Sequence, residues 1–289
     1  VVCRREGVDP AMTISATDFD YISTMVRDRS AIVLDHGKEY LIEARLLPLA
    51  RQRGTGTVAG LVHELRQAPA GPLRDLVVEA MTTNETSFFR DVHPFAALSE
   101  HILPDLLRAR GSERSLNIWC AACSSGQEPY SIAMLIHDIV GADPAWRVRL
   151  LATDLSPAML DRTREGVYTQ FEVNRGLPVK MLVRHFRKEG LHWQIEEPLR
   201  RMIETRLINL DNDLPSMPSM DIIFLRNVLI YFDIETKRQI LARVRRVLRP
   251  DGYLVLGGAE TTLNLDDAFD RVQIGRAPVY RLRDGKASP

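Results

Sequence analysis

The sequence predicts an α/β fold, in which a doubly wound, Rossmann-like sheet is joined to a small N-terminal all-helical domain and carries a small antiparallel β insertion. Three observations support this prediction. Apolar runs at residues 116–120 and 148–153 each lead into a helical pattern, and this alternation is typical of parallel sheets. Residues 13–81 carry helical spacing without a strand pattern, and residues 186–195 form a hairpin pattern with Gly190 near its turn.

Composition and charge exclude several classes of protein. The chain has 289 residues, of which 45% are hydrophobic, so it can form one large domain or two modest ones. Its 38 Lys and Arg residues balance 38 Asp and Glu residues, and this balance offers no broad electrostatic footprint for nucleic acid or an anionic membrane. No apolar run approaches the roughly 20 residues that span a bilayer. We therefore expect a soluble cytoplasmic monomer.

Four segments make up the predicted domain organisation. Residues 1–12 have no clear pattern, which indicates a leader or a remnant of an upstream sequence, with Met12 as the native start. The helical domain spans 13–81, a linker spans 82–95, and the α/β domain spans 96–289, with the β insertion at about 183–204.

Apolar positions at three- and four-residue spacing predict the helices of the first domain. We expect Thr17 to cap the first helix. The expected apolar positions are Phe19, Ile22, Met25 and Val26 in the first helix, Tyr40, Leu41, Ala44, Leu47 and Leu49 in the second, and Val58, Leu61, Val62 and Leu65 in the third, with a fourth helix at 73–81.

Three arginines, Arg45, Arg51 and Arg53, cluster late in the second predicted helix. Spacing alone favours a solvated helix end in which these cations compensate the helix dipole. The alternative is a docking face for an acidic protein surface.

The linker at residues 82–95 combines polar and aromatic side chains. It could lie over a ligand as a lid, with Arg90 as a fixed fork of donors. The alternative is a helix cap followed by two core residues, Phe88 and Phe89. The pattern alone does not separate these two interpretations.

A turn of small residues at 121–126 joins the first predicted strand to a helix in which Pro129 suits the first turn. Small side chains let a ligand approach the backbone, and the start of the helix presents unpaired N–H groups. Neither G-x-G-x-x-G nor G-x-x-x-x-G-K-[ST] is present. We therefore interpret the turn as the wall of a site for a nucleoside that need not carry phosphates.

Asp154 ends the next apolar run, some 30 residues after the turn. At the tip of the second strand, its carboxylate could accept hydrogen bonds from both hydroxyls of a ribose. The alternative is that Asp154 caps the helix that starts near Ser156. The turn that precedes it favours the ribose interpretation.

Cys120 and Cys123 form a C-x-x-C pair, which raises the alternatives of redox chemistry and zinc binding. No second pair and no nearby pair of histidines completes a metal site. Two small side chains that line a turn explain the pair equally well, so we expect no metal site.

The remaining elements of the α/β domain follow in order. We expect helices at 128–140, 157–167 and 234–248, strands at 148–154, 199–203, 205–210, 221–227 and 253–257, a loop at 168–178, and hairpins at 186–195 and at 272–282. The last hairpin adds an antiparallel strand to a mostly parallel sheet.

Four motifs occur in a telling order: TTNETSFFRDVHPF, WCAACSSGQEPYSIAM, LLATDLS and LRNVLIYF. Over about residues 15–282, the chain resembles the chemotaxis receptor glutamate O-methyltransferases of the CheR type. The resemblance implies an S-adenosylmethionine-dependent methyltransferase. Such an enzyme esterifies glutamate side-chain carboxylates of chemoreceptors during chemotaxis adaptation and releases S-adenosylhomocysteine. Gln127 departs from the glutamate that many members have at this position.

The resemblance also implies which residues bind the cofactor. Asp154 would hold the ribose and Asn209 would reach the adenine edge, while Glu128 and the Asn227 carbonyl would accept the methionine ammonium. The full implied set is Asn84, Thr86, Arg90, Glu128, Asp154, Asn209, Leu210, Asn227 and Val228.

Arg90 and Tyr231 resemble the residues that orient the substrate carboxylate, so both are implied as catalytic. A glutamate carboxylate is already ionised at neutral pH, so no general base is required. Two rival functions are a methyltransferase with another target, such as RNA or a small molecule, and a sensor that binds S-adenosylmethionine without transfer. The absence of an Asn-Pro-Pro-aromatic segment disfavours a nucleic-base target, and the presence of Arg90 and Tyr231 disfavours the sensor.

The implied partner is the helical cytoplasmic bundle of a chemoreceptor, with Arg45, Arg51 and Arg53 as docking candidates. In some members of this family the β insertion also binds the C-terminal pentapeptide of a receptor. The short hairpin loop at residues 187–191 predicts that this chain does not.

Overall fold

The protein is described by a computed structural model that covers residues 14–68, 70–141, 143 and 145–283. The predicted leader at 1–12, with Met12 as its end, lies outside these described residues. The chain divides into two compact units, Val1–Thr83 and Asn84–Pro289, and each is described by itself. No described helix is long and apolar enough to cross a membrane.

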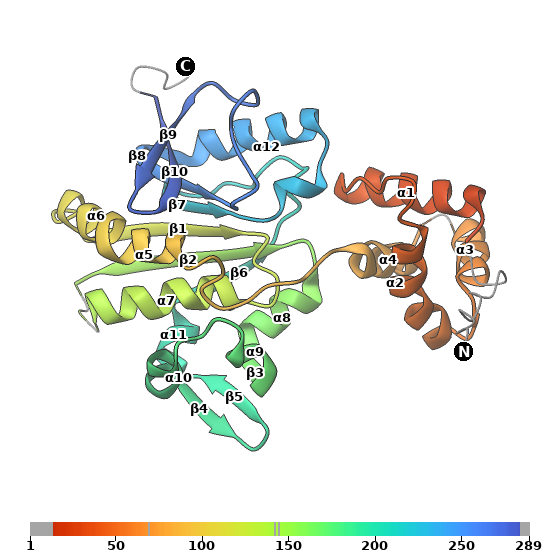
Figure 1. Ribbon diagram of the computed structural model, residues 1–289, viewed down its shortest axis with the longest axis horizontal. Helices are drawn as coiled ribbons and strands as arrows, with labels where there is room; N and C mark the ends of the chain where they lie inside the picture. Colours follow the sequence, from red (N-terminus) through yellow and green to blue (C-terminus); the bar gives the residue numbers. More distant parts are fainter. Residues whose placement is uncertain (1–13, 69, 142, 144, 284–289) are drawn as a thin grey trace, which may run out of the picture. The chain divides into compact units, whose positions relative to one another are not determined.

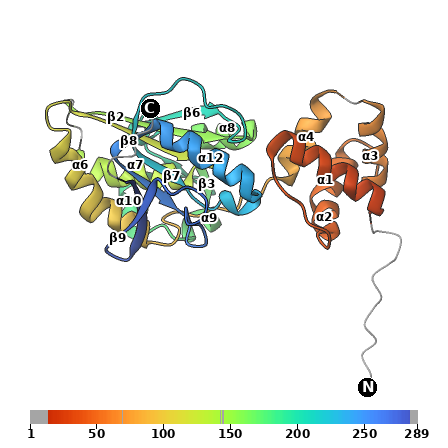
Figure 2. The same cartoon turned by 90° about the horizontal axis from the view of Figure 1, so that it is seen from above.

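The first unit contains α1 (Ala16–Ser30), α2 (Glu39–Gln52), α3 (Val58–Gln67) and α4 (Pro72–Met81), shown in Figures 1 and 2. Its described residues form no strand, so the predicted all-helical domain is confirmed. Side chains from all four helices share one core, which includes Phe19, Ile22, Leu46, Leu61 and Val77. Each helix contributes an apolar stripe, and burial of these stripes is what stabilises short helices.

Two details of the first unit differ from the prediction. Ser15, not Thr17, caps α1, because the Ser15 hydroxyl accepts a hydrogen bond from the Asp18 N–H at 3.1 Å. In α2 the buried side chains are Ile42, Leu46 and Ala50, whereas Tyr40 is 70% exposed. These three recur at four-residue spacing, so the buried stripe is rotated from the predicted one toward the neighbouring helices.

Arg45 has a structural task within this unit. Its guanidinium donates to the Thr82 carbonyl at 3.0 Å and to Thr83 Oγ1 at 2.8 Å, and so closes the end of α4. Arg53 forms an ion pair with a glutamate of α3, and Arg51 is exposed. The three predicted docking residues therefore differ in the contacts that they already make within this unit.

The second unit is built on a seven-stranded sheet in the order β6-β2-β1-β7-β8-β10-β9. The strands are β1 (Ser115–Ala121), β2 (Arg147–Asp154), β6 (Ile203–Leu207), β7 (Met220–Leu225), β8 (Leu248–Leu256), β9 (Phe269–Ile274) and β10 (Ala277–Leu282). The first five named are parallel to one another, and β10 pairs antiparallel with both β8 and β9. This arrangement confirms the predicted doubly wound α/β class with a late antiparallel strand.

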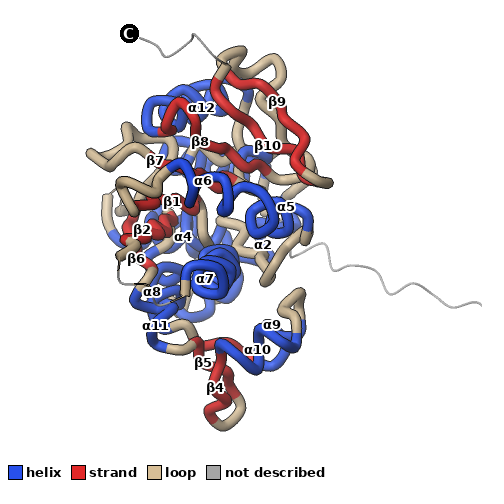
Figure 3. Tube along the Cα trace, turned by 90° about the vertical axis from the view of Figure 1, so that its left-hand side faces the viewer, coloured by secondary structure: helices blue, strands red, loops and turns tan. Residues whose placement is uncertain are grey.

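Helices cover both faces of this sheet. β1 leads through α7 (Gln127–Val140) to β2, and β7 leads through α12 (Ile234–Val247) to β8 in the opposite direction along the sheet. Right-handed crossovers therefore place α7 and α12 on opposite faces. In Figure 3, α7 lies on the same side of the strands as α5 (His93–Ala97) and α6 (Leu103–Ala109), which follow each other through the short π-helical segment η2 (Leu98–Ile102).

A second, three-stranded antiparallel sheet follows α8 (Pro157–Glu165). It consists of β3 (Val167–Thr169), β4 (Phe186–Glu189) and β5 (His192–Ile195) in the order β3-β5-β4, with α9 (Gln170–Asn174), α10 (Val179–His185) and α11 (Glu197–Arg201) around it. The predicted β insertion and its hairpin are thus confirmed.

Short elements in this insertion depart from the prediction. Residues 168–178 are not a plain loop, because Thr169 and Glu172 form a capping box that starts α9. The strand predicted at residues 199–203 is wrong, because Pro198 in the first turn suits a helix and α11 forms there, while Ile203 is already the first residue of β6. The helix predicted to reach residue 167 ends at Glu165, because Gly166 after it adopts a left-handed conformation.

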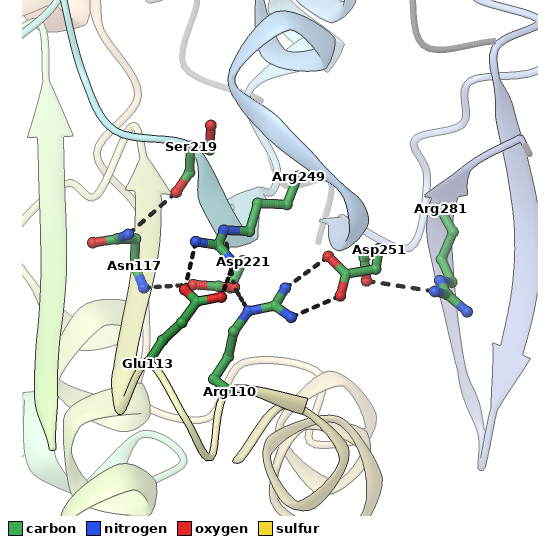
Figure 4. A network of polar contacts seen from close by, with 8 residues as sticks. All are labelled: Arg110, Glu113, Asn117, Ser219, Asp221, Arg249, Asp251 and Arg281. Atoms are coloured by element: carbon green, nitrogen blue, oxygen red, sulfur yellow. Dashed lines mark hydrogen bonds and ion pairs between the residues drawn. The ribbon is translucent and has the colours of Figure 1, made fainter. Parts of the chain in front are cut away.

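The amino end of β7 is anchored by a buried carboxylate, Asp221, which is 0% exposed. Asp221 accepts from Arg110 Nε at 2.7 Å and from the Asn117 N–H at 2.8 Å. Arg110 also binds Asp251 with both terminal nitrogens, at 2.8 and 2.6 Å (Figure 4). This network joins β1, β7 and the start of β8, and so sets the positions from which their carboxyl ends project.

Candidate functional site

The turn after β1 has an unusual backbone. Ala122 and Ser124 adopt positive φ angles of 56° and 51°, and Gly126 has a φ of 94°. A side chain at Gly126 would lie 2.9 Å from Thr163 Oγ1 and from the Tyr168 hydroxyl, so only glycine fits there. The turn is therefore tightly packed against Thr163 and Tyr168 and is built of small residues, as the nucleoside interpretation requires.

Asp154, at the carboxyl end of β2, is buried and linked to this turn. Its carboxylate accepts from the Ser124 N–H at 2.8 Å and from the Ser156 N–H at 2.9 Å. The capping alternative is wrong, because the Ser156 hydroxyl itself caps α8 by accepting from the Met159 N–H. Asp154 thus links the turn after β1 to the turn after β2.

The segment from Asn84 to Val92 packs on the same turn and on α7. The Asn84 carbonyl accepts from Ser124 Oγ at 2.8 Å, and the Phe89 N–H donates to Ser131 Oγ at 2.9 Å. Phe88 and Phe89 are both buried, which confirms that they are core residues. The expected helix cap is absent, because no side chain caps α5.

Further contacts hold this segment in place. The Phe88 ring meets the rings of Tyr168 and Phe186 edge-on, at centroid distances of 5.0 and 5.6 Å. A side chain at Gly176 would lie 2.1 Å from the Phe88 carbonyl oxygen, so the insertion approaches the segment too closely for any residue but glycine. Of the predicted site residues here, Thr86 and Arg90 are half-buried, and Arg90 donates to the Glu85 carbonyl at 3.0 Å.

Arg226, directly after β7, is a site residue that the sequence analysis missed. Its side chain is 1% exposed and donates to Glu128 Oε2 at 2.8 Å, to Asp91 Oδ2 at 2.7 Å and to the Arg90 carbonyl at 2.9 Å. The guanidinium also lies 5.5 Å from the centre of the Phe95 ring. Arg226 therefore joins β7, α7 and the 84–92 segment. A charged residue directly after the apolar run at residues 222–225 was the signal that could have marked the position, although only the fold shows its partners.

Glu128, in the first turn of α7, pairs with Arg226 through only one oxygen. Burial raises the pKa of Glu128 above its usual value, and the attraction of Arg226 only partly opposes this shift. Its second oxygen, Oε1, accepts no hydrogen bond from the residues that the structure describes. Glu128 is thus a carboxylate that a further cation or donor would stabilise.

The loop after β7 contains three predicted residues. Asn227 has a φ of 57°, and a short 3-10 helix, η3 (Leu229–Tyr231), follows. Asn227, Val228 and Tyr231 are half-buried, and the Tyr231 hydroxyl makes no hydrogen bond within the described part of the chain. Glu260, which the sequence analysis also missed, accepts hydrogen bonds from the backbone N–H groups of Asn227 and Val228 in this loop.

Asn209 and Leu210 follow β6 at the same edge of the sheet. Asn209 Oδ1 accepts from the Asp211 N–H at 3.0 Å, an arrangement that stabilises the turn. Leu210 is buried, and its carbonyl accepts from Arg243 at 3.1 Å. The carboxyl ends of β1, β2, β6 and β7 and the segments that follow them therefore present Glu128, Asp154, Asn209, Leu210, Asn227, Val228 and Tyr231 at one edge of the parallel sheet, and the 84–92 segment that carries Asn84, Thr86 and Arg90 packs on the β1 turn.

The two cysteines have the properties of packing residues. Cys120 and Cys123 are buried and unpaired, and burial raises the pKa of both thiols well above the usual value. A protonated, buried thiol is neither a good nucleophile nor a good metal ligand. This environment disfavours the redox and zinc interpretations.

One group of the described residues could offer three metal-ligating atoms: His137, Asp138 and His185. It lies at the far end of α7 from the strand turns. Asp138 is already bound there by His185 Nε2 at 3.0 Å and by Arg184 at 3.1 Å. These contacts tie α7 to the insertion, and they explain the group without a metal.

Comparisons with known proteins match both units. Residues 84–277 match the family described as CheR methyltransferase, SAM binding domain, and residues 17–82 match CheR methyltransferase, all-alpha domain. The chain is 41% identical over 277 residues to chemotaxis protein methyltransferase 1 of Pseudomonas aeruginosa, an alignment that covers 94% of this chain and 100% of that protein. It is 37% identical over 276 residues to chemotaxis protein methyltransferase Cher2 of Pseudomonas putida, covering 94% and 100% of the two chains. A chemotaxis protein methyltransferase of Vibrio parahaemolyticus is also 37% identical over 276 residues, with 94% and 99% covered.

Proposed function

The chain belongs to the CheR methyltransferase family, and from this premise we propose that it methylates glutamate side chains of chemoreceptors. S-Adenosylmethionine would be the methyl donor, and the products would be a glutamate methyl ester and S-adenosylhomocysteine. The observation that carries this proposal is the full-length match to chemotaxis methyltransferases, together with site residues gathered at one edge of the sheet. The proposed substrate, a cytoplasmic part of a receptor, implies that the enzyme acts in the cytoplasm, and we further propose that it acts as a monomer.

The chemistry of the residues fits this cofactor. Asp154 offers a carboxylate beside a turn whose small residues let a ribose approach the backbone. Glu128 is half-buried and offers one carboxylate oxygen without a hydrogen bond among the described residues, which suits the methionine ammonium. Asp154 and Glu128 thus provide oxygen acceptors for the ribose and for the ammonium group, and both side chains are held in place by the contacts described above.

We assign the remaining contacts by position. Asn209 would read the adenine edge and Leu210 would pack against it, as both follow the strand beside β2. Asn84 and Thr86 would cover the cofactor from the segment that packs on the β1 turn. The carbonyl of Asn227, with Val228 beside it, would be the second acceptor for the ammonium.

The bound cofactor would supply an electrophilic sulfonium methyl group. The chain's own residues would then have to position a glutamate carboxylate, which needs no general base because it is ionised at neutral pH. Arg90 has a guanidinium at the half-buried surface, and Tyr231 has a hydroxyl without a partner among the described residues. Both could orient the carboxylate and exclude water while leaving its charge available for attack.

The direct test is to incubate the protein with methyl-labelled S-adenosylmethionine and the cytoplasmic fragment of a chemoreceptor. Methyl esters release methanol in mild alkali, whereas N-methyl groups do not. We expect base-labile label on the receptor, and we expect Arg90→Ala to abolish it while Arg187→Ala, a change on the exposed strand β4, leaves it intact. Base-stable label, label on added RNA instead, or cofactor binding without transfer would each contradict the proposal.

Two of the three arginines predicted to dock on the receptor remain candidates. Arg45 is half-buried against the end of α4, whereas Arg51 is exposed and the Arg53 side chain stays 46% exposed in its ion pair with Glu64. We therefore propose Arg51 and Arg53 as the cations that meet an acidic receptor surface. Arg51→Glu combined with Arg53→Glu should raise KM for the receptor severalfold at low salt without changing affinity for S-adenosylhomocysteine. An unchanged KM would refute this docking face.

The hairpin between β4 and β5 is short, with only Gly190 and Leu191 between the strands. We propose that it does not bind the C-terminal pentapeptide of a receptor. A titration of the protein with such a peptide tests this, and tight binding would contradict it.

A further inference from the structure

The carboxylate of Glu260 accepts hydrogen bonds from four backbone N–H groups. Glu260 lies in the segment after β8 and is 8% exposed. Oε2 accepts from the N–H groups of Gly257 and Asn227, both at 2.7 Å. Oε1 accepts from those of Val228 at 2.9 Å and Ile230 at 3.4 Å. Four N–H donors match an ionised carboxylate, which only accepts hydrogen bonds.

These donors come from the ends of two neighbouring parallel strands. Gly257 follows β8, whereas Asn227, Val228 and Ile230 follow β7. The Glu260 backbone is itself fixed, since its N–H donates to the Gly257 carbonyl at 2.9 Å. The carboxylate therefore determines where the loop after β7 lies relative to the sheet.

Two neighbours of Glu260, Gly257 and Asn227, have constrained conformations. A side chain at Gly257 would lie 2.7 Å from Glu260 Oε2 and 2.9 Å from the Asn227 nitrogen. The position must therefore be glycine for the carboxylate to reach the loop. Asn227 is held at a φ of 57°, which costs free energy and persists only where surrounding contacts enforce it.

The hydrogen bond to Val228 has an electrostatic consequence. The Val228 N–H and the Asn227 carbonyl belong to the same peptide group. A negative charge that accepts from the N–H polarises that group and increases the negative charge on the carbonyl oxygen. Glu260 thus makes the Asn227 carbonyl a stronger acceptor for a cation.

We infer that Glu260 is a positioning residue for the amino-acid end of the cofactor. It would fix the loop that carries Asn227 and Tyr231, and it would strengthen the Asn227 carbonyl toward the methionine ammonium. This inference rests on the proposed function, because it needs the cofactor to bind at the ends of the strands. Glu260 would act through the loop and would not touch the substrate.

The test compares two ligands that differ in one part. S-Adenosylhomocysteine carries the amino acid, whereas 5′-methylthioadenosine keeps the nucleoside and lacks it. We expect Glu260→Gln to raise the Kd for S-adenosylhomocysteine about tenfold or more, as for loss of a hydrogen bond to a charged group. The Kd for 5′-methylthioadenosine should stay within about twofold. Asp154→Asn is the control, and it should weaken both ligands alike.

Each other result has a definite meaning. Equal weakening of both ligands by Glu260→Gln, or no weakening of either, would overturn the inference. If Glu260→Gln does not fold, Glu260→Asp keeps the charge on a shorter side chain, and a selective but smaller loss for S-adenosylhomocysteine is then expected. Failure of the wild type to bind either ligand would instead refute the proposed function.

Discussion

Two buried arginines lie at opposite ends of strand β7, and their surroundings differ. At the amino end, all three side-chain nitrogens of Arg110 donate to carboxylates of Asp221 and Asp251 (Figure 4). At the carboxyl end, Arg226 Nε has no partner among the described residues, and Asp91 and Asn227 beside it adopt positive φ angles. A saturated network serves stability, whereas residues with strained backbone angles around a buried charge are typical of a functional site.

The carboxylates of the two networks show the same difference. The hydrogen bond from Arg110 holds the pKa of Asp251 below its usual value. Burial raises the pKa of Glu128 despite the ion pair with Arg226. The amino-end network thus stabilises its charges fully, while the carboxyl-end network leaves a carboxylate that a cation would stabilise further.

The largest expected effect on stability comes from breaking the amino-end network. Asp221→Ala leaves Arg110 buried without its central partner, so the free energy of unfolding should fall by about 3–5 kcal/mol. Denaturant unfolding measures this change. Asp213→Ala, which removes an exposed carboxylate with only distant arginine partners, is the control and should change it by less than about 0.5 kcal/mol. A loss below about 1 kcal/mol for Asp221→Ala would contradict the structural role.

A matched pair of substitutions separates the two networks. Arg110→Lys and Arg226→Lys each keep a charge but lose the planar fork, so each should lower the free energy of unfolding by about 1–3 kcal/mol. Only Arg226→Lys should also weaken binding of S-adenosylhomocysteine, because Arg226 orients Glu128. Calorimetric titration of both variants checks this. Equal weakening by Arg110→Lys would show that the two ends do not differ in function.

Tyr231 should matter for turnover alone. Its hydroxyl has no hydrogen bond in the described part of the protein, so Tyr231→Phe removes no hydrogen bond of the folded protein. We expect kcat for receptor methylation to fall about tenfold, which is roughly 1.4 kcal/mol, with affinity for S-adenosylhomocysteine unchanged. Tyr40→Phe, at an exposed position of α2, serves as the inert control. A wild-type rate for Tyr231→Phe would refute its catalytic role.

The smallest expected effects are on the pH dependence of stability, and their signs are opposite. The folded pKa of Asp251 is lowered, so its contribution is present above its unfolded pKa and is lost as the pH falls through the folded pKa. Asp251→Asn should therefore lose less stability than the wild type between about pH 6 and pH 3. Unfolding curves across this range test the difference, and parallel curves would contradict it.

The folded pKa of Glu128 is raised, so its contribution is present below its unfolded pKa and is lost as the pH rises through the folded pKa. Relative to Glu128→Gln, the wild type should therefore lose stability between about pH 4 and pH 7. A gain over this range would show that the pair with Arg226 outweighs burial.

The sequence predicts the long elements well because their signals are local. Apolar runs located β1, β2 and β7, and spacing located the buried face of α3. The prediction of which side of α2 is buried was wrong, because packing partners rather than periodicity decide it. The prediction of a strand where α11 forms was also wrong. The capping box at Thr169 and Glu172 was a local signal for α9 that the prediction did not use.

The site is predictable where a residue's role follows from its place at the end of a strand, as for Asp154. Arg226 and Glu260 were missed because their importance lies in contacts between distant parts of the chain. Arg226 meets Glu128 across 98 residues, and Glu260 meets Asn227 across 33. No local pattern records such a contact, and only the folded sheet brings the ends of its strands together.

The proposed activity depends most directly on a nucleoside bound at the carboxyl ends of the strands. The decisive measurement is isothermal titration of S-adenosylhomocysteine into the wild type and into Asp154→Ala, with folding of both verified. We expect clear binding by the wild type and a loss of about 2 kcal/mol or more in the variant, as for removal of a charged hydrogen-bond partner. Equal affinity for the two proteins, or no binding by folded wild type, would contradict this account.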